Sequence, residues 1–210
     1  MELEYKGGNC VVITHKKDEI VSDPGLSGLG LKDQGVTAAV HLVTQPRFAA
    51  AHGDATVVVD GPGEFEVNNC SIWGIAAHAH TAPEDPKTAT MFRIDTDDIT
   101  VAILGHIAPK LNEEQLEAIG VIDVLVVPVG GFGYTLEPKQ AVDLVRSIEP
   151  KIVIPVHYAE EGVQYEVPQA ALDEFLKELG TPAEEPVTKL KLKSGQLPEK
   201  LTVYQITRTK

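Results

Sequence analysis

Three segments of the sequence place histidines where they could bind a metal ion or transfer a proton. His157 directly follows an apolar run at 151–156, and His106 follows another at 101–104 through a single glycine. His78 and His80 are two residues apart, so a continuing strand presents both on one face. Imidazole nitrogens bind zinc and exchange protons near neutral pH. These histidines are candidate ligands or acid–base groups, with buried structural histidines or a solvated face as the alternatives.

Few other residues offer chemistry of this kind. Asp60 ends an apolar run at 56–59 and is a candidate ligand, although capping of the turn that follows is the favoured alternative. The glycine-rich segment 130–134 either lines a pocket with backbone N–H groups or forms a flexible turn. The sequence contains no Gly-x-Ser-x-Gly elbow, no phosphate-binding loop and no Cys-x-x-Cys pair. Nucleophilic catalysis by serine or cysteine is therefore disfavoured.

The elements that must position these side chains begin with strands. Runs rich in β-branched residues, separated by turn residues, predict strands at 9–14, 19–22, 38–44, 56–59, 64–67, 71–78, 90–94 and 99–104. Two further runs, 123–129 and 151–156, are apolar at nearly every position, which is typical of strands covered on both faces. Helices are expected from the N-cap Asn112 to Gly120, at 137–148 and at 168–179.

Composition and charge exclude several classes of function. The chain has 210 residues, enough for one domain at 1–210, and its 18 basic and 31 acidic residues give a net charge of −13. Such a charge disfavours binding to nucleic acid or to a membrane surface. No apolar run is long enough to span a membrane, and the two cysteines are expected to be buried reduced thiols. We therefore expect a cytoplasmic protein, and a homo-oligomer is compatible with the sequence.

The C-terminal tail carries the opposite charge. Residues 187–210 hold six basic residues and one acidic residue. Within this tail, the alternating stretch 187–193 places Lys189, Lys191 and Lys193 on one face of an expected strand. Lysines on a strand face protect a sheet edge from pairing with other chains, and this explanation is favoured over an anion-binding patch.

The order of elements and several motifs resemble the metallo-β-lactamase superfamily, in particular its small zinc-dependent hydrolase-like members. The motifs are GNCVVI at 8–13, VSDP at 21–24, VDGPGEFEV at 59–67, LGH at 104–106, IDVLVVPVGG at 122–131 and KIVIPVHY at 151–158. The resemblance covers nearly the whole chain. It implies an α/β fold, a four-layer αβ/βα sandwich of two mixed β-sheets flanked by helices, with the site along one edge of the sheets.

The resemblance also implies that the metal ligands of the family are replaced. The motif Thr/Ser-His-x-His-x-Asp-His falls on the stretch 44–50, where its ligand positions carry Gln45, Arg47, Ala49 and Ala50. A bridging aspartate of the family falls on His106, and the middle histidine falls near His78 or His80. His157 alone matches cleanly. A guanidinium about 4 Å from a divalent ion is repelled by about 8 kcal/mol at an effective dielectric constant near 20, so the usual dinuclear zinc site is disfavoured.

Two main functions follow from this comparison. In the first, the protein is non-catalytic and uses no metal cofactor, and a pocket of Gln45, Arg47, His106 and His157 binds an anionic small molecule or a carboxylate of a partner. In the second, it is a metal-dependent hydrolase with a single zinc, manganese or iron ion held by His157, His106 and one of His78 and His80. His52 could join that set only if its loop is re-routed. A structural or oligomeric role is the third alternative.

Overall fold

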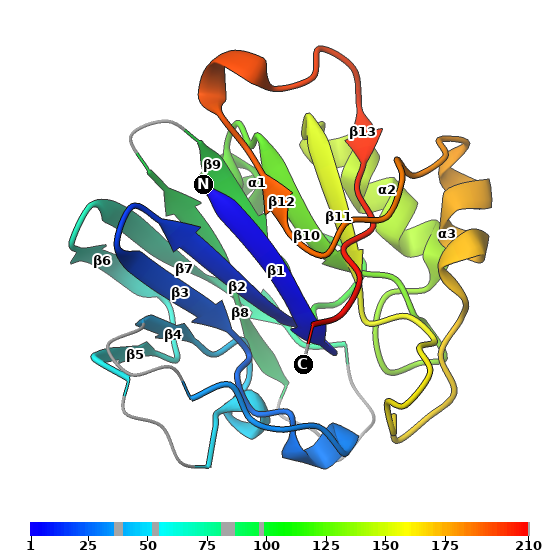
Figure 1. Ribbon diagram of the computed structural model, residues 1–210, viewed down its shortest axis with the longest axis horizontal. Coiled ribbons are helices and arrows are strands. Elements are labelled where there is room, and N and C mark those ends of the chain that lie inside the picture. The colour runs from blue at the N-terminus through cyan, green and yellow to red at the C-terminus, as the bar shows by residue number, and fades with distance from the viewer. Residues whose placement is uncertain (36–39, 52–54, 81–86, 97–98, 210) are drawn as a thin grey trace.

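The computed structural model describes residues 1–35, 40–51, 55–80, 87–96 and 99–209, which form two β-sheets with helices on one side (Figure 1). The first sheet has six strands in the order β12-β1-β2-β3-β4-β5. Its members are β1 (Glu2–Gly7), β2 (Cys10–His15), β3 (Asp18–Ser22), β4 (Val40–Leu42), β5 (Val57–Val59) and β12 (Leu190–Lys191). Neighbours from β12 to β3 are antiparallel, whereas β3, β4 and β5 are parallel.

The second sheet has seven strands in the order β13-β11-β10-β9-β8-β7-β6. Its members are β6 (Gly63–Val67), β7 (Cys70–His78), β8 (Thr88–Asp95), β9 (Thr100–Ile103), β10 (Val124–Pro128), β11 (Ile152–Val156) and β13 (Thr202–Val203). The first four strands along the chain pair antiparallel, and β9, β10, β11 and β13 are parallel. Every residue of β10 and β11 is buried, as their uninterrupted apolar sequences predict.

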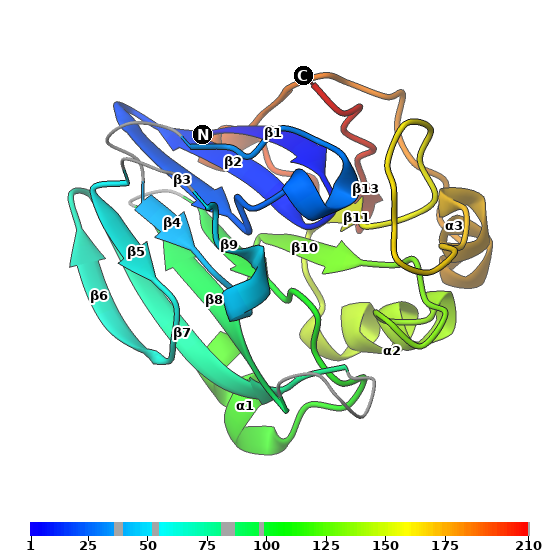
Figure 2. The same ribbon diagram turned by 90° about the horizontal axis from the view of Figure 1, so that it is seen from below.

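Two apolar clusters explain why the sheets stack. One lies between the sheets and includes Ile13, Leu42, Phe92 and Ile154. The other lies between the second sheet and the helices α1 (Glu113–Ile119), α2 (Pro138–Ile148) and α3 (Leu172–Leu179). Figure 2 shows these helices together on the far side of the second sheet from the first. The predicted α/β sandwich of two mixed sheets is confirmed.

The outer face of the first sheet is covered differently. Its buried residues Cys10, Val12 and Val21 pack against Leu26, Leu29 and Leu31. These leucines belong to the loop after β3, which contains a single 3-10 turn at Ser27–Leu29. The layer on this side is therefore a loop, whereas three α-helices form the layer on the other side.

The ends of several elements differ from the sequence expectations. The strand β1 was not anticipated, because its alternation of charged and apolar residues at the chain start is short. Helix α3 begins at Leu172 and not at 168, since Ala171 is extended, with φ −70° and ψ 151°. The expected strand at 38–44 is observed as Val40–Leu42, and residues 38 and 39 lie outside the described residues. The tail strand is only two residues long.

The tail lysines lie beside the acidic face of β1. Lys189 pairs with Glu2 at 3.1 Å and with Glu4 at 2.8 Å, and Lys191 pairs with Glu2 at 3.1 Å. Because β12 is the edge strand of the first sheet, these lysines shield an open edge. Two lysines of the positive tail, Lys189 and Lys191, thus form ion pairs with Glu2 and Glu4 near the N-terminus.

Two further expectations concern thiols and membranes. Cys10 and Cys70 are both buried and are not joined in a disulfide, as predicted. Burial, the largest effect, raises the pKa of the Cys10 thiol well above its usual value. Within the described ranges, no helix has the length and apolar character needed to cross a bilayer.

Candidate functional site

The candidate site lies where parallel strands of both sheets end. Asp23 follows β3, Gln45 follows β4, His106 follows β9, and His157 follows β11. The glycine-rich loop that carries Tyr134 follows β10. Parallel strands direct their carboxyl ends to one edge of a sheet, where ligands of open α/β sheets bind. In Figure 1, β3 and β11 both run toward the lower side of the molecule, where these segments meet.

Two buried histidines form the centre of the site. The ring centroids of His106 and His157 are 4.6 Å apart in an edge-to-face arrangement, and the residues are 0% and 2% exposed. The His106 ring also contacts Phe48 at 4.7 Å and Tyr134 at 4.9 Å. The His157 ring contacts Tyr165 at 4.7 Å. The two imidazoles therefore lie in an aromatic and largely dry environment.

Arg47 supplies a positive charge at this centre. It lies in the 3-10 turn Pro46–Phe48, the next element after β4. Its Nε donates to Gln45 Oε1 at 2.9 Å, and its Nη2 lies 3.4 Å from His106 Nδ1. The guanidinium carbon is 4.8 Å from the ring centroid of Phe48 and 4.8 Å from that of Tyr134, within cation–π range of both.

Burial and this neighbouring charge keep both histidines neutral. Burial, followed by His157 and Arg47, lowers the pKa of His106 well below its usual value. Burial lowers the pKa of His157 to about 4, although its hydrogen bond with Gln169 opposes the shift. Taking two cations out of water next to a guanidinium is costly, so the neutral forms prevail at pH 7.

The hydrogen bonds assign the tautomers of the neutral rings. Gln169 Nε2 donates to the carbonyl oxygens of Val167 and Pro168, so its Oε1 is the acceptor for His157 Nδ1 at 3.0 Å. His157 Nε2 therefore carries a lone pair. A guanidinium can only donate, so His106 Nδ1 accepts and His106 Nε2 carries the proton. That Nε2 is buried and has no hydrogen-bond partner among the described residues.

A buried carboxyl holds the β4 end of the site in place. Asp23 accepts the backbone N–H of Thr44 at 2.8 Å and the Thr44 hydroxyl at 2.7 Å. Burial raises the pKa of Asp23 to about 7, against the lowering effect of the Thr44 hydrogen bonds and the Arg47 charge. Gly105, before His106, has φ 63° and packs so tightly on Thr44 that a Cβ would lie 2.6 Å from Thr44 Cβ. Asp23, Thr44 and Gly105 thus fix the spacing between the two sheets.

The structure brings together four of the candidate residues: Gln45, Arg47, His106 and His157. His80 adjoins them, because its backbone N–H donates to the His106 carbonyl at 2.9 Å and its proximity contributes to the lowered pKa of His106.

Two candidates lie elsewhere. His78 and Asp60 are exposed, and among the described residues they take no part in the ring contacts or hydrogen bonds that join the four. His78 is the last residue of β7 and is exposed, and its role as a ligand stays a prediction. His52 lies outside the described residues.

The residues present do not fit the metal centre that the resemblance implies. In the part of the chain that the structure describes, no three His, Cys, Asp or Glu side chains converge as a metal-binding group. A guanidinium lies 3.4 Å from one of the two buried imidazoles. A zinc centre takes three or four protein ligands, and a nearby permanent cation opposes it.

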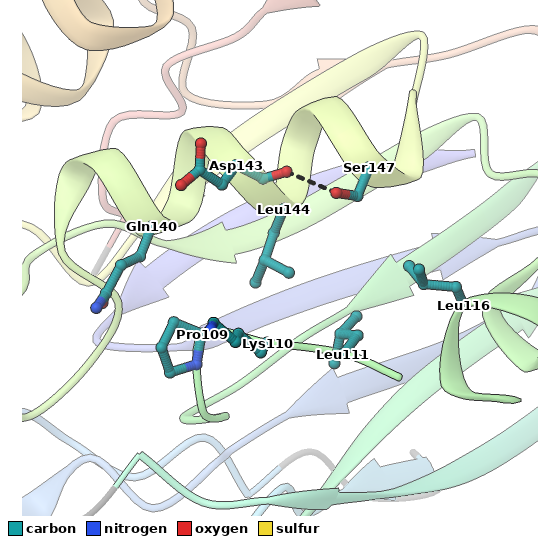
Figure 3. A pocket seen from close by; sticks show the side chains of 8 residues that line it. All are labelled: Pro109, Lys110, Leu111, Leu116, Gln140, Asp143, Leu144 and Ser147. Carbon is teal, nitrogen blue, oxygen red and sulfur yellow. Dashed lines mark hydrogen bonds between the residues drawn. The ribbon is translucent and has the colours of Figure 1, made fainter. Parts of the chain in front are cut away.

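A separate hollow lies on the helical side of the molecule. It has a volume of about 350 Å³ and opens between α1, α2 and the segment 109–111. Leu144 points from α2 toward Pro109, Lys110 and Leu111 across this hollow (Figure 3). Its lining contains no member of the His106 and His157 centre.

The fold and this site define a class of protein, the two-sheet α/β sandwich with its site at the carboxyl ends of the strands. The family model described as the β-lactamase superfamily domain matches residues 2–157, and the chain belongs to that family. A Thermotoga maritima protein of the metallo-β-lactamase superfamily has a similar structure, with a TM-score of 0.78 and 27% identity. The similarity covers 98% of this chain and 99% of that one.

Curated relatives are more distant or match in part. A UPF0173 protein of Pyrococcus furiosus is 40% identical over 81 residues, which cover 38% of this chain and 33% of the relative. The chain therefore matches about a third of that relative. A UPF0173 metal-dependent hydrolase of Natranaerobius thermophilus is 23% identical over 186 residues, which cover 75% of this chain and 83% of the relative.

Proposed function

We propose that this member of the superfamily is non-catalytic, that the Arg47 guanidinium stands where the family holds metal ions, and that the centre binds an anionic small molecule. One observation carries the proposal: the guanidinium lies 4.8 Å from the ring centroids of both Phe48 and Tyr134, is hydrogen-bonded to Gln45 and is 3.4 Å from His106. A fixed cation at this position supplies positive charge without a metal.

The chemistry of the centre suits a carboxylate. Arg47 is partly exposed, whereas Gln45, His106 and His157 are buried, so a ligand reaches the charge from one side. Guanidinium groups bind carboxylates through charge-assisted hydrogen bonds, which are strengthened where water is excluded. The Nε2–H of His106, on the same ring as the nitrogen that faces Arg47, is a further buried donor. With both histidines neutral, Arg47 supplies the positive charge among these four side chains.

Metal-dependent hydrolysis is the second candidate. The lone pair of His157 Nε2 is suited to binding a metal ion, and the curated relative from Natranaerobius thermophilus is named a metal-dependent hydrolase. His80, near His106, is the remaining imidazole that could join such a set. This candidate requires Arg47 to leave the centre, because the guanidinium and a divalent ion repel each other.

The Arg47→Met variant tests the first candidate. It keeps most of the apolar stem and removes the charge, so we expect acetate and malonate to bind at least about tenfold more weakly than to the wild type, since a hydrogen bond to a charged group contributes about 1.5–3 kcal/mol. Isothermal calorimetry measures the affinity. Arg146→Met, which removes an exposed guanidinium on α2, is the matched control and is expected to bind both carboxylates as the wild type does. Equal affinities of wild type and Arg47→Met contradict the proposal.

A further inference from the structure

A second hollow is lined by positively charged side chains. It has a volume of about 340 Å³ and is lined by Lys6, Gly30, Leu31, Lys32, Gln34, Arg208 and Thr209. Three of its seven lining residues are cationic, and none is acidic. The segments involved are the end of β1, the loop after the 3-10 turn Ser27–Leu29 and the chain end, which meet near the C-terminal label in Figure 1. A cationic hollow is unexpected in a chain with a net charge of −13.

Ion pairs and hydrogen bonds fix the positions of two of the three cationic side chains, Lys6 and Arg208. Lys6 Nζ lies 3.0 Å from Glu4 Oε2 and donates to Thr209 Oγ1 at 2.8 Å. Arg208 Nε lies 2.8 Å from Glu160 Oε1, and Arg208 Nη2 donates to the Glu161 carbonyl at 3.1 Å. The Lys6 and Arg208 side chains are only 13% and 21% exposed. Their charged groups are thus positioned before any ligand arrives, which lowers the entropic cost of binding.

Lys32, the third cationic residue, gives the hollow a net positive charge. Lys32 is exposed and forms no ion pair with a described acidic residue. Glu4 and Glu160 offset Lys6 and Arg208, but Lys32 has no such counterpart. Glu4 is also paired with Lys189 at 2.8 Å, so its own charge is shared between two lysines. The hollow therefore attracts anions although the whole chain repels them.

We infer that this hollow, lined by Lys6, Lys32 and Arg208, binds a small molecule that carries a phosphate group. Lysine ammonium groups act as point charges that suit a phosphate, whereas the flat fork of Arg208 is already engaged through two of its nitrogens. The amide of Gln34 and the hydroxyl of Thr209 are further polar groups in the lining, and Leu31 offers an apolar contact for the remainder of the ligand. This site shares no residue with the Arg47 centre and does not depend on the proposed function.

Calorimetric titration with inorganic phosphate and with phenyl phosphate tests the inference. We expect Lys6→Gln to weaken the binding of both at least about tenfold, because it removes a charge-assisted hydrogen bond. Glu4 keeps Lys189 as its partner in this variant. Lys32→Glu changes an exposed side chain that folding does not require, and we expect it to abolish measurable binding. Phenyl phosphate is expected to bind more tightly than inorganic phosphate because Leu31 lies in the lining.

Two controls make the outcome decisive. Lys200→Ala removes an exposed lysine of the same basic tail, outside this lining, and Arg47→Met removes the charge of the other centre. Lys200→Ala is expected to bind phosphate as the wild type does, and Arg47→Met is expected to keep the binding that Lys6→Gln weakens, whatever anion the other centre takes. The inference is overturned if the wild type binds neither compound in the millimolar range, or if Lys32→Glu binds both unchanged. It is also overturned if Arg47→Met alone removes binding, since phosphate then occupies the centre.

Discussion

Acidification from pH 7 to pH 4 is expected to remove about 3 kcal/mol of stability through His157 alone. The pKa of this buried imidazole is lowered to about 4, whereas an unfolded chain has its usual value near 6.5. The unfolded state therefore binds the proton first, and the stabilisation present above pH 6.5 is lost as the pH falls toward 4. His106 shifts in the same direction. Asp23 has the opposite effect on stability. Its pKa is raised to about 7, so the folded state favours the neutral carboxyl group, and a lower pH restores that form.

Comparison of variants isolates the contribution of His157. His157 has φ 53°, and asparagine tolerates this left-handed conformation, so His157→Asn is the suitable change. Urea unfolding between pH 4 and pH 7 should show that this variant loses about 3 kcal/mol less than the wild type over that range. The exposed His78→Asn is the control and should follow the wild-type profile. A His157→Asn profile parallel to that of the wild type contradicts the assignment of a buried neutral imidazole.

Gly105→Ala is expected to lower the free energy of unfolding by about 3 kcal/mol. A left-handed alanine accounts for about 1–2 kcal/mol and overpacking for at least about 1 kcal/mol. The backbone φ at Gly105 is 63°, and an added Cβ would lie 2.6–2.7 Å from three atoms of the Thr44 side chain. Thr44 cannot withdraw without breaking its hydrogen bonds to the buried Asp23. The change should therefore also displace Gln45 and weaken carboxylate binding at the Arg47 centre.

Gly133→Ala separates the two contributions. Gly133 has a similar φ of 71°, but nothing lies within 4 Å of an added Cβ. This variant therefore carries the backbone strain alone, and we expect it to lose about 1–2 kcal/mol. Chemical denaturation of the two variants in parallel measures the difference. If Gly105→Ala and Gly133→Ala lower the free energy of unfolding equally, the contact between Gly105 and Thr44 does not constrain the site.

Much of the fold was predictable because strands and helices carry local signals. The uninterrupted apolar sequences of β10 and β11 marked buried parallel strands, and Asn112 marked the start of α1 with a capping box that the structure contains. The ends of short elements were less predictable. Helix α3 loses its expected first turn because 168–171 bonds instead to neighbouring loops, where Ala170 N donates to Gly130 O and Ala159 N to Ala170 O. Such tertiary hydrogen bonds have no local signature.

The centre of the site was predictable in part for the same reason. His106 and His157 come soon after strands, so position in the sequence located them, and the resemblance of 44–50 to the ligand motif of the family located Gln45 and Arg47. Their neighbours are set by tertiary packing. Phe48 and Tyr134, which contact the guanidinium, and Gln169, which orients His157, come from segments without a periodic pattern. Asp23 followed a predicted strand, but its burial beside Thr44 becomes visible only in three dimensions.

The metal content of the purified protein tests the central claim, that Arg47 stands in place of metal ions, most directly. The protein is incubated with zinc, manganese and iron salts, dialysed without chelator and analysed by mass spectrometry. We expect far less than one ion of any of these metals per chain, because two neutral imidazoles beside a guanidinium form an incomplete and repelled donor set. One ion per chain that survives dialysis and is lost in His157→Asn would contradict the claim.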